Sequence, residues 1–267
     1  MGLRAQFRAS VSQVEVYASV TDTDGRPLRD LTVADFTVLD DGEPQRLTVF
    51  QAGDVPASVA LAIDRSVSMR GARLAVARTA GRVFVRALDP DDRVMVIGIG
   101  SQVEVLAAMA EDRSGAERAI AALDAFGTTS LHDAAIEALD LLESEGGRRA
   151  IVLLSDGEDR YSRATAADVL ARARRSDVMI YPVALGPRRP ALFAELAAAS
   201  GGRWYHLREM RHLAPTLAGI AEDLGAQYLL GYAPSRPWGT EPEWRSIEVR
   251  VARDGVRVRA RGGYTTR

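Results

Sequence analysis

Apolar and polar positions follow two different periods along the chain of 267 residues. Residues 11–50 alternate in short runs that aspartate–glycine pairs interrupt, as in VEVYASV, TDTDG and FTVLDDGEPQ. Alternation with such turns predicts antiparallel hairpins. From Val59 the period changes, and continuous apolar runs are followed by helical patterns. After Gln227 the alternation returns, and RSIEVRVARDGVRVRARGGY predicts a hairpin that turns at Asp254 and Gly255.

The middle part of the chain alternates strands with helices. The predicted strands cover residues 59–63, 93–99, 103–107, 150–155, 178–185 and 202–207, and the predicted helices cover residues 71–88, 114–124, 131–143, 165–175, 190–199 and 213–224. This order predicts a doubly wound α/β fold with a mostly parallel sheet. The short strand at 103–107 is predicted to be the hairpin partner of the strand before it.

Three segments follow from these changes of period. We expect an N-terminal β segment over residues 1–56, an α/β domain over 57–225 and a C-terminal β segment over 226–267. The two ends of an inserted domain usually lie close together. The two β segments are therefore expected to pair with each other into one β-sandwich-like domain.

Composition narrows the chemistry that the chain can perform. All 34 basic residues are arginine and there is no cysteine, which excludes lysine Schiff bases, lysine-bearing phosphate loops, disulfides and thiolate catalysis. A net charge of −2 indicates no general attraction to nucleic acid or anionic membranes. No apolar run reaches the ~18 residues of a transmembrane segment, and the first fifteen residues lack the apolar centre of a signal peptide. The sequence therefore fits a cytoplasmic protein or an exported one whose signal is absent from this chain.

Oxygen-bearing side chains gather where the predicted parallel strands end, which is the edge where open α/β sheets bind ligands. Asp64, Ser66 and Ser68 directly follow the first apolar strand in VALAIDRSVSMR, and Asp156 follows another in LLSDGEDR. The hydroxyl-rich loop FGTTSLHDA lies between them in the chain. Residues two apart in an extended loop point the same way, so the first three can converge on one point. Hard oxygen ligands with few formal charges suit Mg²⁺ or Mn²⁺.

Some of these residues also have a simpler interpretation. Asp and Ser commonly cap helices, so Ser68 can instead be the cap of the helix over 71–88. Glu158 and Asp159 can adjust the rim of a metal site or belong to a solvated acidic loop. The arginines of the C-terminal hairpin are interpreted as a solvated sheet face rather than a nucleic-acid site.

Together the motifs resemble a von Willebrand factor type A domain with a metal-ion-dependent adhesion site. The family pattern is D-x-S-x-S, then a threonine in a glycine-rich loop before a helix, then an aspartate in a strand-end D-G. These positions fall here on Asp64, Ser66, Ser68, Thr129 and Asp156. The loop reads G-T-T where the family often has G-G-T, so Thr128 is an alternative ligand, although alignment to SLHDA favours Thr129. The resemblance covers about 57–225 and implies a six-stranded, mostly parallel sheet with helices on both faces and 103–107 as the antiparallel edge strand.

The flanking β segments add a narrower resemblance. They are similar to bacterial VWFA-related proteins of the acidobacterial type, which carry β segments on both sides of the domain and are often exported. The resemblance therefore implies a periplasmic or extracellular protein, with a cytoplasmic location as the alternative.

The resemblance implies a binding protein rather than an enzyme. The five residues would hold one Mg²⁺, or Mn²⁺ or Ca²⁺ in its place, and an Asp or Glu carboxylate of a protein partner would complete the coordination. One alternative is a structural assembly subunit with an inherited metal site. Another is a metal-assisted hydrolase, for which Glu158 or His132 would have to serve as the base.

Overall fold

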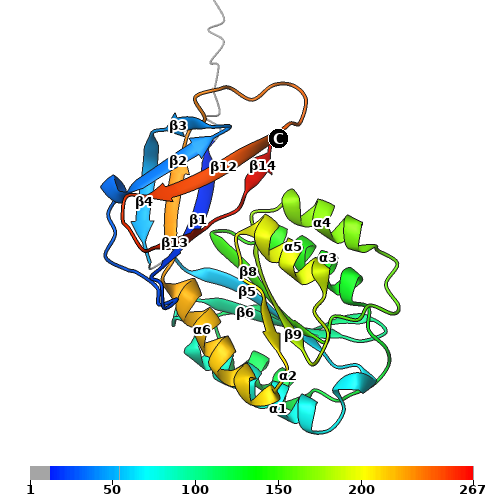
Figure 1. The fold of residues 1–267 in the computed structure, drawn as a ribbon. Coiled ribbons are helices and arrows are strands. Elements are labelled where there is room, and N and C mark those ends of the chain that lie inside the picture. Colours follow the sequence, from blue (N-terminus) through cyan, green and yellow to red (C-terminus); the bar gives the residue numbers. More distant parts are fainter. Residues whose placement is uncertain (1–12, 54, 267) are drawn as a thin grey trace, which may run out of the picture.

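The structure, a computed structural model, describes residues 13–53 and 55–266 and has two parts (Figure 1). One part is built on a six-stranded sheet with helices on both faces, and the other on two four-stranded antiparallel sheets. This confirms the predicted fold class, including the β-sandwich-like part that both ends of the sequence build.

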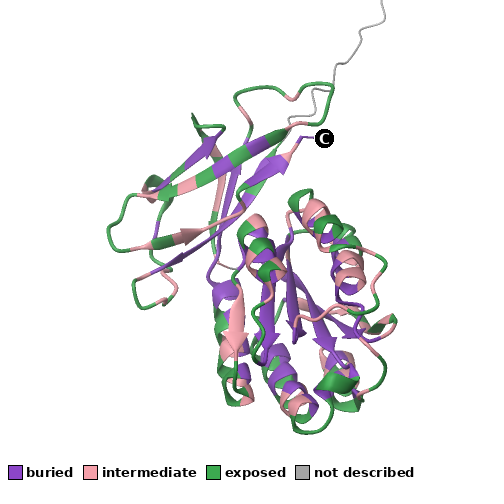
Figure 2. Cartoon of the chain, turned by 45° about the vertical axis from the view of Figure 1, so that its right-hand side comes forward, coloured by how far each residue is buried: buried purple, intermediate pink, exposed green. Residues whose placement is uncertain are grey.

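The six-stranded sheet consists of β5 (Ala57–Asp64), β6 (Arg93–Ile99), β7 (Val103–Ala110), β8 (Arg148–Ser155), β9 (Met179–Leu185) and β10 (Tyr205–Leu207). Their order is β10-β9-β8-β5-β6-β7. All neighbours are parallel except β7, which runs antiparallel to β6 at the edge, as predicted. The central strand β5 is buried along its whole length because helices cover both faces (Figure 2).

The helices divide three to each face of this sheet within the described residues. On one face lie α1 (Ala72–Ala87), α2 (Ser114–Ala122) and α6 (Leu213–Gly225), and on the other lie α3 (Leu131–Glu143), α4 (Ala166–Arg174) and α5 (Ala191–Ser200). The alternation of β5 makes this possible, because Leu61 and Ile63 pack with the first group whereas Ala60 and Ala62 pack with the second. None of the described helices is both long enough and apolar enough to cross a membrane.

The β part takes strands from both sides of the α/β part. Its strands are β1 (Val14–Thr21), β2 (Phe36–Asp40), β3 (Glu43–Gln45), β4 (Leu47–Ala52), β11 (Tyr228–Tyr232), β12 (Trp244–Val251), β13 (Arg257–Arg259) and β14 (Gly263–Thr265). One sheet has the order β13-β1-β11-β4 and the other β14-β12-β2-β3. Apolar side chains of both sheets share one buried core, which includes Val16, Val38, Leu230 and Ile247.

Turn signals predicted one hairpin correctly and one wrongly. β2 and β3 form a hairpin that turns at Asp41 and Gly42, which both have positive φ. The predicted hairpin across Asp254 and Gly255 is wrong, since β12 pairs with β2 and β14 whereas β13 pairs with β1. The turn carries the chain from one sheet to the other, because the burial of apolar faces, rather than the turn, selects the partner of each strand.

A buried polar network joins the two parts at the end of α6. Asp223 accepts hydrogen bonds from Tyr181 Oη at 2.8 Å, from Arg259 Nη2 at 2.6 Å and from Ser19 Oγ at 3.3 Å. Tyr181 belongs to the parallel sheet, whereas Ser19 and Arg259 belong to the β part. The carboxyl ends of the parallel strands lie at the far side of the α/β part, away from this junction (Figure 1).

Candidate functional site

Three loops meet around a cleft of about 270 Å³ at the carboxyl edge of the parallel sheet. The lining residues are Ser66, Val67, Ser68, Gly127, Thr128, Thr129, Asp156, Glu158 and Arg160. Four of the five predicted ligands therefore line one cleft. The fifth, Asp64, lies next to it at the end of β5 and contacts the first loop.

The Asp64 carboxylate is fully buried. It accepts hydrogen bonds from the Ser66 amide at 2.9 Å and from the Ser155 hydroxyl at 2.7 Å. Burial raises the pKa of this carboxyl, and the charge of Asp156 acts in the same direction. The adjacent guanidinium of Arg65 pairs instead with Glu104, at 2.8 Å. Within the described residues no cationic side chain pairs with Asp64, so its charge is compensated by hydrogen bonds alone.

The two serines of the first loop face each other. Their hydroxyl oxygens lie 2.9 Å apart, and Ser66 precedes a short 3₁₀ helix, η2 (Val67–Met69). The interpretation of Ser68 as a helix cap is wrong, because Gly71 occupies the N-cap of α1 and no described side chain caps that helix. Helix capping therefore does not account for the serine at position 68, and its role as a predicted metal ligand stands as the alternative.

Backbone hydrogen bonds connect the threonine loop to both the first and the third loop of the cleft. The Thr129 carbonyl accepts hydrogen bonds from the Arg160 amide at 3.0 Å and the Tyr161 amide at 3.1 Å, and Gly127 O accepts one from the Val67 amide at 3.2 Å. Gly127 has φ +71°, and a Cβ there would lie 2.5 Å from Ser101 Oγ, so a glycine is required at this position. Thr129 is buried whereas Thr128 is half-buried, and both line the cleft.

The third loop begins at Asp156, directly after β8. Its Oδ1 accepts a hydrogen bond from the Glu158 amide at 3.1 Å. Between them Gly157 has φ +79°, and a Cβ there would lie only 1.9 Å from Pro190 Cγ. This glycine allows the loop to turn sharply and leaves the Asp156 side chain facing the cleft.

The two acids after Asp156 have different roles. Glu158 lines the cleft and binds the guanidinium groups of Arg160 at 2.8 Å and Arg188 at 2.7 Å, which lower the pKa of its carboxyl. Asp159 accepts hydrogen bonds from the His132 amide at 3.2 Å and from the Ser162 hydroxyl, and so fixes the start of α3. Only Glu158 therefore belongs to the rim.

The donor set suits a hard divalent cation that keeps room for an external oxygen. It offers two carboxylates and three hydroxyls, with no nitrogen or sulfur. Among the described residues no three His, Cys, Asp or Glu side chains form a metal-binding cluster, so a cation here would depend on the hydroxyls. The buried charge of Asp64 fits such a group, because a cation would supply the positive charge that no described side chain provides.

Sequence reasoning missed one residue of this site. Ser155 is the last residue of β8, is fully buried, and holds the second oxygen of Asp64. Its hydroxyl also accepts a hydrogen bond from the Gly157 amide at 3.0 Å, so it links two of the predicted ligand loops. A serine at the end of an otherwise apolar strand was the available signal.

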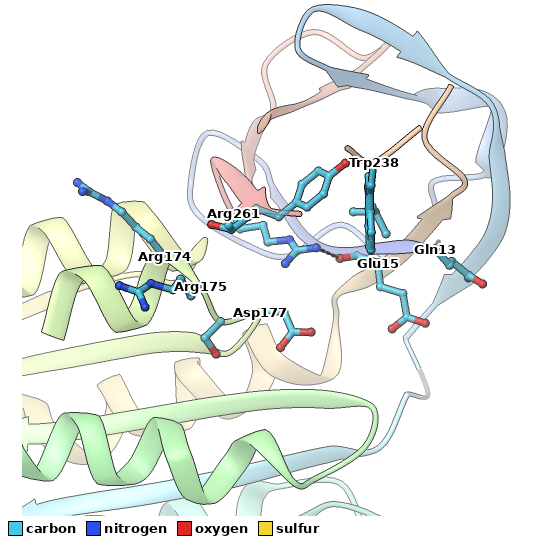
Figure 3. Close-up of a pocket in the computed structure, with 11 residues that line it drawn as sticks. Gln13, Glu15, Arg174, Arg175, Asp177, Trp238 and Arg261 are labelled. Carbon is cyan, nitrogen blue, oxygen red and sulfur yellow. Dashed lines mark hydrogen bonds between the residues drawn. The ribbon is translucent and has the colours of Figure 1, made fainter. Parts of the chain in front are cut away.

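A second cleft, of about 220 Å³, lies between the two parts of the molecule (Figure 3). Arg261 donates a hydrogen bond to the Glu15 carbonyl oxygen there at 2.7 Å, and Asp177 on the other wall pairs with Arg149. Figure 3 shows Arg174 extending away from Arg261, so the arginines of this cleft do not converge on one point. Acidic and basic side chains are mixed along its walls, and we assign it no ligand.

The family model for the von Willebrand factor type A domain matches residues 59–158, which include the first two loops of the cleft and the start of the third. The chain contains a von Willebrand factor type A domain. The matched region ends at Glu158, two residues beyond the last predicted ligand of this A domain. No curated protein sequence matches the chain significantly.

Solved structures share the fold of the A domain. A von Willebrand factor type A protein from Catenulispora acidiphila is 13% identical with a TM-score of 0.57, over 98% of this chain and 76% of that one. The conserved hypothetical protein BatB from Bacteroides thetaiotaomicron is 18% identical with a TM-score of 0.51, over 62% and 98%. The vWF domain of the type V pili tip protein Mfa5 from Porphyromonas gingivalis is 14% identical with a TM-score of 0.55, over 63% and 94%. The Catenulispora match also extends over the β part.

Proposed function

We propose that the A domain is a protein-binding module that captures an acidic side chain of its partner through a divalent cation. Asp64, Ser66, Ser68, Thr129 and Asp156 would hold the cation, with Mg²⁺ preferred and Mn²⁺ or Ca²⁺ as alternatives. When bound, it would act as a Lewis acid that accepts a carboxylate oxygen of the partner. The chain's own residues provide the charge, the orientation and the shape of the cleft around that oxygen.

The observation that carries this proposal is the state of Asp64. A fully buried carboxylate that no cationic side chain of the described residues pairs with is costly unless something else supplies positive charge. Ser66 and Ser68 bring neutral oxygens to the cleft beside it, and Asp156 adds the second carboxylate. Two carboxylates only balance a divalent ion, so the ion would remain able to attract a third anionic oxygen.

A binding role explains the site better than hydrolysis does. Glu158 is held by two arginines, which favour its charged form and occupy its oxygens. The His132 ring contacts the Ala164 carbonyl oxygen through Nδ1 at 3.0 Å. His132 is not among the residues that line the cleft, and both oxygens of Glu158 are paired with arginines, so we favour binding over hydrolysis. The assembly-subunit alternative makes a different prediction, namely that partner binding does not depend on the cation.

We further propose that the protein works outside the cytoplasm. The support is the fold shared with the vWF domain of Mfa5, a tip protein of type V pili. Fractionation of cells that produce the full-length protein would test this, and recovery in the cytosolic fraction would contradict it.

Calorimetric titration of Mg²⁺ into the wild-type protein and Asp64→Ala tests the proposed function. We expect one site per chain in the wild type and none in the variant. Partner proteins are then recovered from envelope extracts in the presence of Mg²⁺ or EDTA. A wild-type protein that binds no divalent ion refutes the proposal, and partners that remain in EDTA favour the assembly-subunit alternative.

A further inference from the structure

Each of the three loops around the cleft exposes one large apolar side chain. Val67 on the first loop is 50% exposed, Phe126 on the second is 43% exposed and Tyr161 on the third is 64% exposed. Four other large apolar residues are similarly exposed within the described part of the chain, and they are scattered: Val33, Val83, Val105 and Trp244. Three of seven therefore gather at one edge of one sheet, which single exposed apolar residues do not normally do.

The three side chains are held on fixed backbone next to the predicted ligands. Val67 lies between Ser66 and Ser68, and its amide bonds to Gly127 O. The Tyr161 amide bonds to Thr129 O at 3.1 Å. The Phe126 amide bonds to Arg65 O at 2.9 Å, and its ring covers the Arg65 guanidinium at 4.1 Å. Their exposure is therefore a fixed feature of the cleft rim and not a property of a loose loop tip.

Arginines outnumber acidic residues around the cleft once Asp64 and Asp156 are assigned to the cation. Arg160 and Arg188 share the single carboxylate of Glu158, so one of the two positive charges has no acidic partner within the described residues. Arg73, which approaches the Ser68 carbonyl oxygen at 3.5 Å, adds another cation close to the first loop. A ligand that fits this surface has a negative charge together with apolar side chains.

We propose that Val67, Phe126 and Tyr161 form an apolar collar that selects the partner. The partner would present its acidic residue in an exposed peptide segment with aliphatic or aromatic residues directly beside it. The carboxylate would enter the cleft, and the flanking side chains would cover the collar. This inference rests on the proposed function and adds the sequence chemistry of the partner, because burial of the collar would supply apolar contact that a carboxylate alone lacks.

A peptide selection tests the collar. The probe is a display library of nine-residue peptides with a fixed central Asp and random neighbours, selected on the protein in Mg²⁺. The collar variant carries Val67→Thr and Tyr161→Ser, and leaves Phe126 in place because that ring covers Arg65. The matched control carries Val83→Thr and Val105→Thr, which replace valines on α1 and β7 that are 42% and 45% exposed. Thermal unfolding verifies that both variants fold.

We expect the wild type and the control to enrich apolar residues beside the Asp, and the collar variant to bind those peptides about tenfold more weakly. Replacing the central Asp by Asn, or adding EDTA, should abolish binding to all three proteins. Selected peptides with an essential Asp but random neighbours overturn the collar and leave the proposed function intact. Apolar peptides that need the collar but neither the Asp nor Mg²⁺ overturn the proposed function. A library that yields no binder counts against both.

Discussion

Asp64→Asn separates the proposed metal ligand from the fold. The side-chain oxygen of Asn can still accept from the Ser66 amide, and its NH₂ group can donate to the Ser155 hydroxyl, so both hydrogen-bonded contacts of Asp64 survive. What disappears is a fully buried negative charge. Because each hydrogen bond contributes about 1 kcal/mol net, we expect the free energy of unfolding in EDTA to fall by no more than about 1 kcal/mol.

With Mg²⁺ the two proteins should diverge. A ligand that binds only the folded state stabilises it by about 2.7 kcal/mol at a concentration of 100 times Kd. For a chain of this size that corresponds to a rise in Tm of roughly 5–11 °C for the wild type, against little or none for the variant. Differential scanning calorimetry in EDTA and in Mg²⁺ measures both quantities.

Two results would refute this reasoning at different points. Equal Tm values for the wild type with and without Mg²⁺ would mean that the cleft holds no such ion. An Asn variant that loses several kcal/mol in EDTA would mean that the Asp64 charge is already compensated within the protein. In that case the observation that carries the proposed function would be mistaken.

Three further predictions concern the site and the junction. Thr129→Val should weaken Mg²⁺ binding in calorimetry about tenfold, the equivalent of one lost oxygen contact, whereas Thr128→Val should not; the reverse order would make Thr128 the ligand. Asp223→Ala should cost about 3–5 kcal/mol in urea unfolding, because it leaves Arg259 and Tyr181 without their shared acceptor, and a loss below about 1 kcal/mol would contradict a joining role. Burial raises the pKa of Tyr17 from its ordinary value of 10.0 to about 12, and its hydroxyl is buried without a hydrogen-bond partner among the described residues. Because the folded pKa lies above the unfolded one, ionisation of Tyr17 does not affect stability below pH 10, and it lowers stability progressively as the pH rises towards 12. Tyr17→Phe should add about 1 kcal/mol at pH 8 and reduce the loss between pH 10 and 12, and an unchanged slope in denaturant titrations would argue against it.

The elements of the α/β part were largely predictable from the sequence. β6 over Arg93–Ile99 and α3 over Leu131–Glu143 coincide with the predicted strand and helix, because a continuous apolar run and a 3.6-residue period are local signals. The partners of the C-terminal strands were not predictable in the same way. The Asp254–Gly255 pair indicates that the chain turns there, but it does not indicate which strand follows as a partner. Packing between residues distant in the sequence determines that β13 pairs with β1.

Some residues of the candidate site were likewise predictable from the sequence, and others were not. The positions of Ser66, Ser68, Thr129 and Asp156 in the sequence were enough to predict that they share one cleft. These residues follow parallel strands of one sheet or precede a helix beside it. Ser155 was missed because it is the last residue of the predicted strand, and the prediction from sequence included only side chains that follow the strands. The apolar collar was missed for a related reason: hydrophobicity along the sequence assigns residues such as Val67 to the core, and only three-dimensional packing shows that they are exposed.

The construction of the β part from both sides of the A domain has a consequence for the order of folding. β1 must wait for β11, which is synthesised only after the entire parallel sheet and its helices. The cost of closing so long a loop falls when the A domain folds first, because its two ends then lie side by side, as the pairing of Ala52 with Tyr228 requires. The A domain would thus act as a folding template for the β part, and a defect that slows its folding would leave β1 as an unpaired edge strand, open to association with other chains.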